Sequence, residues 1–187
     1  MLFRSDRAGG GRCSAAATGA LNWGFGFLSY DLEEAALALP GFMSQLDLNS
    51  KQALAACMPA VNGMFTARSL AKMYALLAGR GELAGVRLIS ERRMDQVMAV
   101  QNRGMGKVIP LSMQWRLGYH RVFTNPVRRI SMQNGFGHYG YGGSGAWADP
   151  DRKLSFGLVV NSGAGTPFGD GRILALTHAA VHCVNKR

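Results

Sequence analysis

GFGHYGYGGSGAW, residues 135–147, holds six glycines around one histidine, and its structure decides how the rest of the chain is interpreted. Gly135, Gly137 and Gly140 spell G-x-G-x-x-G, the glycine pattern of dinucleotide-binding loops. That pattern holds a pyrophosphate only where a strand precedes it and a helix N-terminus follows it. Residues 144–161 instead predict two strands joined by a turn, so the sequence argues against a dinucleotide site.

Two other interpretations of the glycine run remain. Glycine permits positive φ and removes the bulk of a Cβ, so the run could simply be a tight turn. However, it stands at the start of a predicted strand, carries His138, and precedes a hairpin. That setting is typical of an edge strand beside an active site, where a substrate lies along the backbone and an N–H faces a developing oxyanion.

Helical periodicity occupies the chain before the glycine run. An apolar stripe predicts a helix over 67–79, capped by Thr66 and ended by Gly79. The members of the stripe are Ala67, Leu70, Ala71, Tyr74, Leu77 and Ala78. A second helix is expected over 91–100, with Ser90 as its cap. Its buried edge would hold Met94, Val97 and Met98.

From about residue 115 the period of the apolar residues changes to two, which is typical of strands. Strands are predicted over 115–123 and 129–134, and then over 144–148 and 154–161 on either side of a DPDRK turn. A final helix over about 170–184 would turn four residues inward: Ile173, Leu176, Ala180 and Val184. Helices followed by an antiparallel sheet and a C-terminal helix make an α+β fold, because strands and helices do not alternate.

The composition of the chain is that of a globular protein. Of its 187 residues, 48% are hydrophobic and 17% charged, and no apolar run reaches the roughly 18 residues of a spanning helix. Residues 1–20 lack periodicity and are expected to be disordered or spurious, whereas 21–187 should form the folded part. No clear signal peptide is present, so a bacterial-type cytoplasmic location and export both stay open, and the oligomeric state is unknown.

Basic residues outnumber acidic ones and give a net charge of +10. They are scattered rather than clustered with aromatic residues, which favours a solvated basic surface over a nucleic-acid site. His178 and His182 have the i, i+4 spacing of zinc ligands, but HAAVH lacks the Glu of zinc-protease helices and a third ligand. No nucleic acid, metal or other cofactor is therefore expected.

Two segments resemble the serine beta-lactamase-like family, which includes class C beta-lactamases, DD-peptidases and related esterases. They are PAVNGMFTARSLAKMYALLAGRGELAGVRLIS, residues 59–90, and NGFGHYGYGGSGAWADPDRKLSFGLVVNS, residues 134–162. The resemblance covers about residues 55–185. It implies that 21–187 is the C-terminal part of such a domain, as a partial beta-lactamase/transpeptidase-like fold.

The resemblance also implies roles for five positions. His138 stands where the family's third motif carries Lys or His, a polar group that faces the bound acyl substrate. Gly140 is the motif glycine that leaves room for substrate, and the N–H of Tyr141 would be one oxyanion donor. Gly142 and Gly143 would keep the edge of the strand open.

The family's acylating serine belongs to a Ser-x-x-Lys pair, in which the lysine one helical turn away helps remove the serine proton. The literal match in this chain is SLAK, from Ser69 to Lys72. Both residues lie opposite the predicted apolar stripe, on a solvent face, whereas a catalytic lysine needs partial desolvation. SLAK is therefore not expected to be the nucleophile, and neither another such pair nor the family's Tyr-x-Asn loop is found before residue 55.

The sequence thus predicts a C-terminal fragment of a serine hydrolase, of esterase or amidase type, without its acylating serine. The intact protein would cleave small-molecule esters, amides or peptides through an acyl-enzyme. Two alternatives stay open. One is a non-catalytic relative that only binds such ligands in the same groove, and the other is a basic module that binds anionic polymers.

Overall fold

The computed structural model describes residues 47, 49–59, 62–106, 111–124, 130–140, 143–161 and 171–186. Its helices are α3 (Lys51–Ala55), α4 (Ala67–Ala78), α5 (Glu91–Met98) and α6 (Gly171–Asn185). Its strands are β1 (Glu82–Leu83), β2 (Val86–Arg87), β3 (His120–Arg121), β4 (Phe136–Tyr139), β5 (Gly145–Asp149) and β6 (Leu154–Leu158). The predicted α+β order is confirmed, while the segment expected over 1–20 lies outside the described residues.

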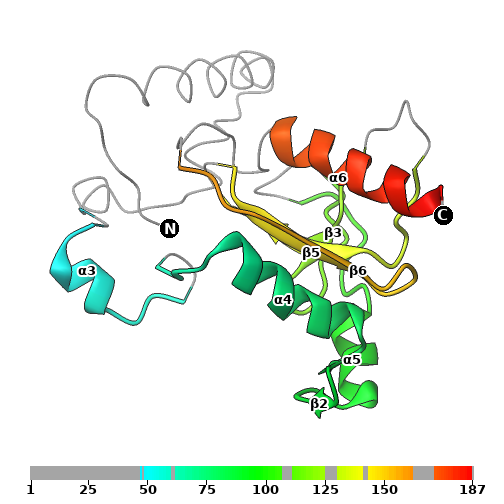
Figure 1. Cartoon of the computed structure of the whole chain (residues 1–187), viewed down its shortest axis with the longest axis horizontal. Helices are drawn as coiled ribbons and strands as arrows, with labels where there is room; N and C mark the ends of the chain where they lie inside the picture. Colours follow the sequence, from blue (N-terminus) through cyan, green and yellow to red (C-terminus); the bar gives the residue numbers. More distant parts are fainter. Residues whose placement is uncertain are drawn as a thin grey trace.

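Four strands form the main sheet, in the order β3-β4-β5-β6, and each neighbouring pair is antiparallel. Helix α4 covers one face of this sheet and α6 the other (Figure 1). Every residue of β5 is buried, because the strand lies between two neighbours and under both helices. Alternation along β5 turns Ala146 and Ala148 towards α4 and Trp147 towards α6.

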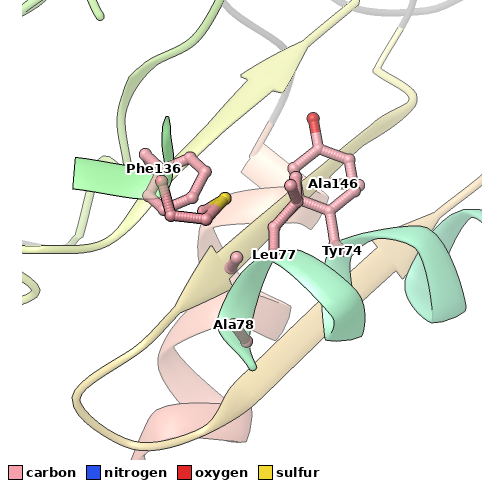
Figure 2. Close-up of a cluster of buried hydrophobic side chains, with 7 residues drawn as sticks. Tyr74, Leu77, Ala78, Phe136 and Ala146 are labelled. Carbon is pink, nitrogen blue, oxygen red and sulfur yellow. The ribbon is translucent and has the colours of Figure 1, made fainter. Parts of the chain in front are cut away.

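Helix α4 begins at the residue that the sequence predicts. The Ser69 N–H donates to Thr66 Oγ1 and the Thr66 N–H donates to Ser69 Oγ, a reciprocal capping box that satisfies the first turn. The C-cap is Gly79, also as predicted. The buried stripe of the helix packs on the sheet, as Figure 2 shows for Tyr74, Leu77, Ala78, Phe136 and Ala146.

Residues 130–134 form no strand, so the strand predicted over 129–134 is wrong within the described residues. Three carbonyls of this segment accept hydrogen bonds from distant side chains: Ile130 from Thr124, Ser131 from Arg152 and Gln133 from Arg116. A backbone whose acceptors are satisfied by side chains does not need a neighbouring strand. The segment is therefore held as a loop.

The strand expected over 115–123 is also shorter than predicted, since only His120 and Arg121 form β3. A turn precedes it, in which the Arg116 N–H donates to the Tyr119 carbonyl at 2.8 Å. Gly118 inside this turn has a φ of 81°, which extended backbone does not adopt. The alternation of apolar residues thus begins in a segment before β3 whose backbone forms a turn and is not part of the sheet.

Helix α6 is rotated slightly from the predicted orientation. Ile173 is buried as expected, but Leu176 is 44% exposed, and Thr177 and Val181 are buried instead. The reason is a buried hydrogen bond, in which Trp147 Nε1 donates to Thr177 Oγ1 at 2.8 Å. This bond satisfies the threonine hydroxyl inside the core, so a polar residue occupies a position that periodicity would give to leucine. No described helix is long and apolar enough to span a bilayer.

Candidate active site

The glycine run contains all of β4, the connection to β5 and the first three residues of β5. The Gly140 N–H donates to the Ser144 carbonyl at 2.7 Å, and the Gly143 N–H donates to the Gly140 carbonyl at 3.2 Å. Gly143 has a φ of 100°, a conformation that side chains with a Cβ rarely adopt. Because a strand follows the run, there is no helix N-terminus here to bind a pyrophosphate, and the dinucleotide interpretation fails.

Gly137 brings β4 close to β5. A Cβ at this position would lie 2.2 Å from the Ala146 carbonyl oxygen and 2.6 Å from Trp147 Cβ. Since these atoms belong to the backbone and to a fully buried residue, there is no room for a side chain. The contact fixes β4 against its neighbour and so fixes the place of His138, the next residue.

Strand β4 is not the edge strand that the sequence predicts, because β3 lies beside it. However, β3 pairs only with Phe136 and Gly137. Past Gly137, no strand of the described part of the chain covers this side of β4, and the N–H of Tyr139 donates to His120 Nε2 at 3.0 Å. Among the described residues, this side, the margin of β4 next to Gly140, therefore has no strand partner.

His138 is exposed at this margin. It lies opposite Ala146 in the ladder and on the face of the sheet that α4 covers. The centroid of its ring is 6.4 Å from that of Trp115, which is half-buried, and 5.2 Å from that of His120. These neighbours partly desolvate His138 and lower its pKa below the usual value, so the ring is neutral near pH 7. A neutral imidazole can donate with one nitrogen and accept with the other.

Two tyrosines lie close to the same part of the sheet. Tyr74 on α4 is buried, and its ring packs edge-on against Tyr119 with the centroids 6.0 Å apart. Burial raises the pKa of Tyr74 and of Tyr119. Both phenols therefore keep their protons at neutral pH, and their rings pack against each other at this end of the sheet.

Ser69 and Lys72 do not contribute to this margin. Both side chains are exposed, as predicted. Ser69 Oγ belongs to the cap of α4, where it also donates to the Thr66 carbonyl at 3.0 Å. Within the described residues, the hydrogen bonds of Ser69 Oγ all involve Thr66, so its observed role is to cap the helix.

The other predicted positions have different outcomes. Tyr141 and Gly142 lie outside the described residues. Gly140 is half-buried at the end of β4, and Gly143 is buried with its N–H bonded inside the turn. On α6 the rings of His178 and His182 stack at 6.0 Å, and the described residues include no group of three or more His, Cys, Asp or Glu side chains that could bind a metal ion.

Sequence reasoning missed His120, a buried residue whose ring centroid lies 5.2 Å from that of His138. The period-two pattern places it among residues of one face of a strand and gives no sign of a hydrogen bond to Tyr139. Only the register that pairs His120 with Gly137 brings its ring to the margin. No local motif could have revealed this contact.

Comparison with known proteins shows the family of this chain. Residues 3–180 match the family described as Beta-lactamase. The chain belongs to the beta-lactamase family. It is 39% identical to the esterase/beta-lactamase LipL of Mycobacterium tuberculosis (strain ATCC 25618 / H37Rv) over 111 residues, which are 56% of this chain and 23% of LipL.

Two solved structures of the same fold resemble this member of the beta-lactamase family. One is a penicillin-binding protein homologue from Caulobacter crescentus, with a TM-score of 0.57 and 34% identity, covering 63% of this chain and 31% of that chain. The other is a family VIII carboxylesterase, with a TM-score of 0.54 and 32% identity, covering 61% of this chain and 30% of that chain. The chain thus spans about a quarter to a third of the length of the relatives that it matches.

Proposed function

We propose that this chain forms the sheet side of the active site of a serine hydrolase that cleaves small-molecule esters, amides or peptides. The observation that carries the proposal is the end of β4, where an exposed and neutral His138 precedes Gly140 on a strand margin that no strand of the described residues pairs with. Membership of the beta-lactamase family and similarity to an esterase and a carboxylesterase support hydrolysis of a carboxylic ester.

The proposed reaction proceeds through an acyl-enzyme. A serine oxygen attacks the substrate carbonyl carbon, and the carbonyl oxygen becomes an oxyanion for which we propose the N–H of Tyr141 as one donor. Gly140, Gly142 and Gly143 would leave the margin free of side chains so that the substrate can approach the backbone. Collapse of this intermediate expels the alcohol or amine, and water then releases the acid and regenerates the serine.

In this proposal His138 contacts the substrate. Because partial desolvation lowers its pKa, the imidazole is neutral near pH 7. It can donate a hydrogen bond to the acyl group or the leaving group without placing a fixed charge beside the substrate. A neutral histidine therefore suits a neutral ester or amide.

The acylating serine is proposed to lie in a segment outside these 187 residues. The one Ser-x-x-Lys in the sequence is the cap of α4, and the chain spans only 23% of LipL and about 30% of the carboxylesterase. A longer protein or a second polypeptide would supply the serine to the margin of β4.

A fluorophosphonate probe tests the assignment of the nucleophile, since it labels activated serines covalently. We expect no labelling of this chain above that of the heat-denatured protein, and no difference between wild type and Ser69→Ala. Labelling of the wild type that disappears in Ser69→Ala would make SLAK the nucleophile and overturn this part of the proposal.

A binding experiment tests the site itself. N-(4-nitrophenyl)butanamide, an amide of acyl-substrate type, should shift the NMR signals of His138 and Gly140. His138→Ala should weaken binding about tenfold, the loss expected for one hydrogen bond and its packing. His182→Ala is the matched control, because it removes an exposed histidine from α6 on the other face of the sheet. Equal effects of the two substitutions, or shifts elsewhere only, would place the ligand away from β4.

A further inference from the structure

We propose that His120 is a positioning residue that takes the place of a missing strand partner at the end of β4. The evidence that His120 holds the end of β4 in place is its hydrogen bond and its ring contacts in the free protein. Its consequence for catalysis rests on the proposed function, because only then does the margin at Gly140 receive an acyl substrate.

The register of the sheet shows which partner is missing. His120 pairs with Gly137 in an antiparallel ladder, so the residue opposite Tyr139 would be Gly118. Gly118 instead lies in the turn before β3, with a φ of 81°. The N–H of Tyr139 therefore has no backbone carbonyl across from it, and His120 Nε2 accepts its hydrogen bond at 3.0 Å.

The second ring nitrogen fixes the state of this imidazole. His120 Nδ1 lies 2.7 Å from the carbonyl oxygen of Arg121, and a carbonyl only accepts hydrogen bonds. Nδ1 must therefore carry the proton, which leaves Nε2 bare to accept from Tyr139. One neutral tautomer satisfies both contacts, whereas a doubly protonated ring would direct a second N–H at the N–H of Tyr139.

Burial and charge favour the neutral ring over the doubly protonated one. The His120 residue is 2% exposed, and desolvation lowers its pKa to about 4. The charged and titratable groups that face it act in the same direction: His138, Arg116 and Arg121. The ring therefore stays neutral, and its acceptor stays available, across the pH range in which ester hydrolysis would be measured.

The ring of His120 also contacts the aromatic residues of the margin. Its centroid lies 4.9 Å from Tyr139, 5.2 Å from His138, 5.6 Å from Phe123 and 5.8 Å from Trp115. It thus restrains both residues that precede Gly140, one by a backbone hydrogen bond and the other by a ring contact. Since misplacement of a reacting group by about 1 Å can cost 100-fold in rate, this restraint would matter for the acyl site.

Solution NMR tests the contact directly in the whole chain without substrate. A trans-hydrogen-bond scalar coupling between the Tyr139 amide nitrogen and His120 Nε2 is expected, with His120 Nε2 showing the chemical shift of an unprotonated acceptor. Absence of the coupling would overturn the proposal, and so would a protonated Nε2.

A matched pair of variants adds a rescue test. Glutamine places its side-chain oxygen near the position of Nε2, whereas asparagine reaches only the position of Nδ1. The Tyr139 amide should exchange with solvent about tenfold faster in His120→Asn than in His120→Gln, while the Trp147 amide in β5 changes equally in both. Equal exchange of Tyr139 in the two variants would contradict the positioning role. If His120→Asn does not fold, the coupling in wild type and the protection in His120→Gln decide.

These results are independent of the proposed function. If the coupling is present but the amide ligand does not bind at β4, the positioning stands and the hydrolase site falls. If the ligand binds and the coupling is absent, the site stands and His120 loses its assigned role.

Discussion

Replacing Gly137 with alanine should destabilise the sheet, because the position has no room for a Cβ. The new Cβ would lie 2.2 Å from the Ala146 carbonyl oxygen, 2.6 Å from Trp147 Cβ and 2.7 Å from Trp147 Cα. None of these atoms is the end of a flexible side chain. Relief therefore requires β4 to move away from β5, which stretches the hydrogen bonds of their ladder.

The size of the effect follows from this geometry. Carbon contacts need about 3.5 Å, so the strands must separate by roughly 1 Å at this point. Overpacking of a well-filled site costs about 1–3 kcal/mol, and each weakened ladder bond adds up to about 1 kcal/mol. We expect Gly137→Ala to lower the free energy of unfolding by about 3 kcal/mol.

Urea denaturation followed by far-UV circular dichroism measures this loss as a lower midpoint with an unchanged slope. Gly171→Ala is the control, because no atom lies within 4 Å of a Cβ at this exposed position at the start of α6. It should change the free energy of unfolding by about 0.5 kcal/mol or less. A Gly137→Ala variant as stable as Gly171→Ala would refute the close contact between β4 and β5.

Three further predictions concern buried and capping polar groups. Thr177→Val removes the acceptor of Trp147 Nε1–H and should lower the free energy of unfolding by about 1–3 kcal/mol in urea denaturation. Thr177→Ser keeps a hydroxyl and should recover most of this loss. Equal stability of the two variants would contradict the hydrogen bond. The free energy of unfolding should fall as pH drops from about 6.5 towards 4, because the unfolded chain protonates His120 at a higher pH than the folded chain does. The decrease should be smaller in His120→Gln, and identical pH profiles of the two proteins would contradict burial of the neutral ring. This pH dependence includes the charged groups that face the ring: Arg116, Arg121 and His138. Ser69→Ala removes one half of the capping box with Thr66 and should lower the free energy of unfolding by about 0.5–1 kcal/mol in thermal denaturation. An unchanged free energy of unfolding would show that this cap does not stabilise α4.

Local signals predicted several elements correctly. Thr66 and Ser90 cap α4 and α5 as expected, and the turn before β6 lies where the sequence places it. The apolar stripe that ends in Leu77 and Ala78 is the face buried against the sheet. Such features depend on side chains within about one helical turn or one hairpin of each other, so the sequence carries them without tertiary context.

The candidate site was predictable only in part. The position of His138 beside a glycine turn and a hairpin followed from the sequence. The strand expected over 129–134 was wrong, because side chains of distant arginines satisfy backbone carbonyls of this segment. The outward place of Leu176 was not foreseen, because the hydrogen bond from Trp147 brings Thr177 into the core instead. Periodicity contains no information about a hydrogen bond to another element.

By itself the sequence determined helices α4, α5 and α6, the caps of the first two, the central hairpin and a glycine run that no helix follows. Only the tertiary structure decided that β3 would be two residues long, that Thr177 would enter the core, and that His120 would bind the end of β4. The physical reason is the distance along the chain between the partners. Tyr139 lies 19 residues from His120, and Trp147 lies 30 from Thr177, so each hydrogen bond exists only once the sheet has set its register.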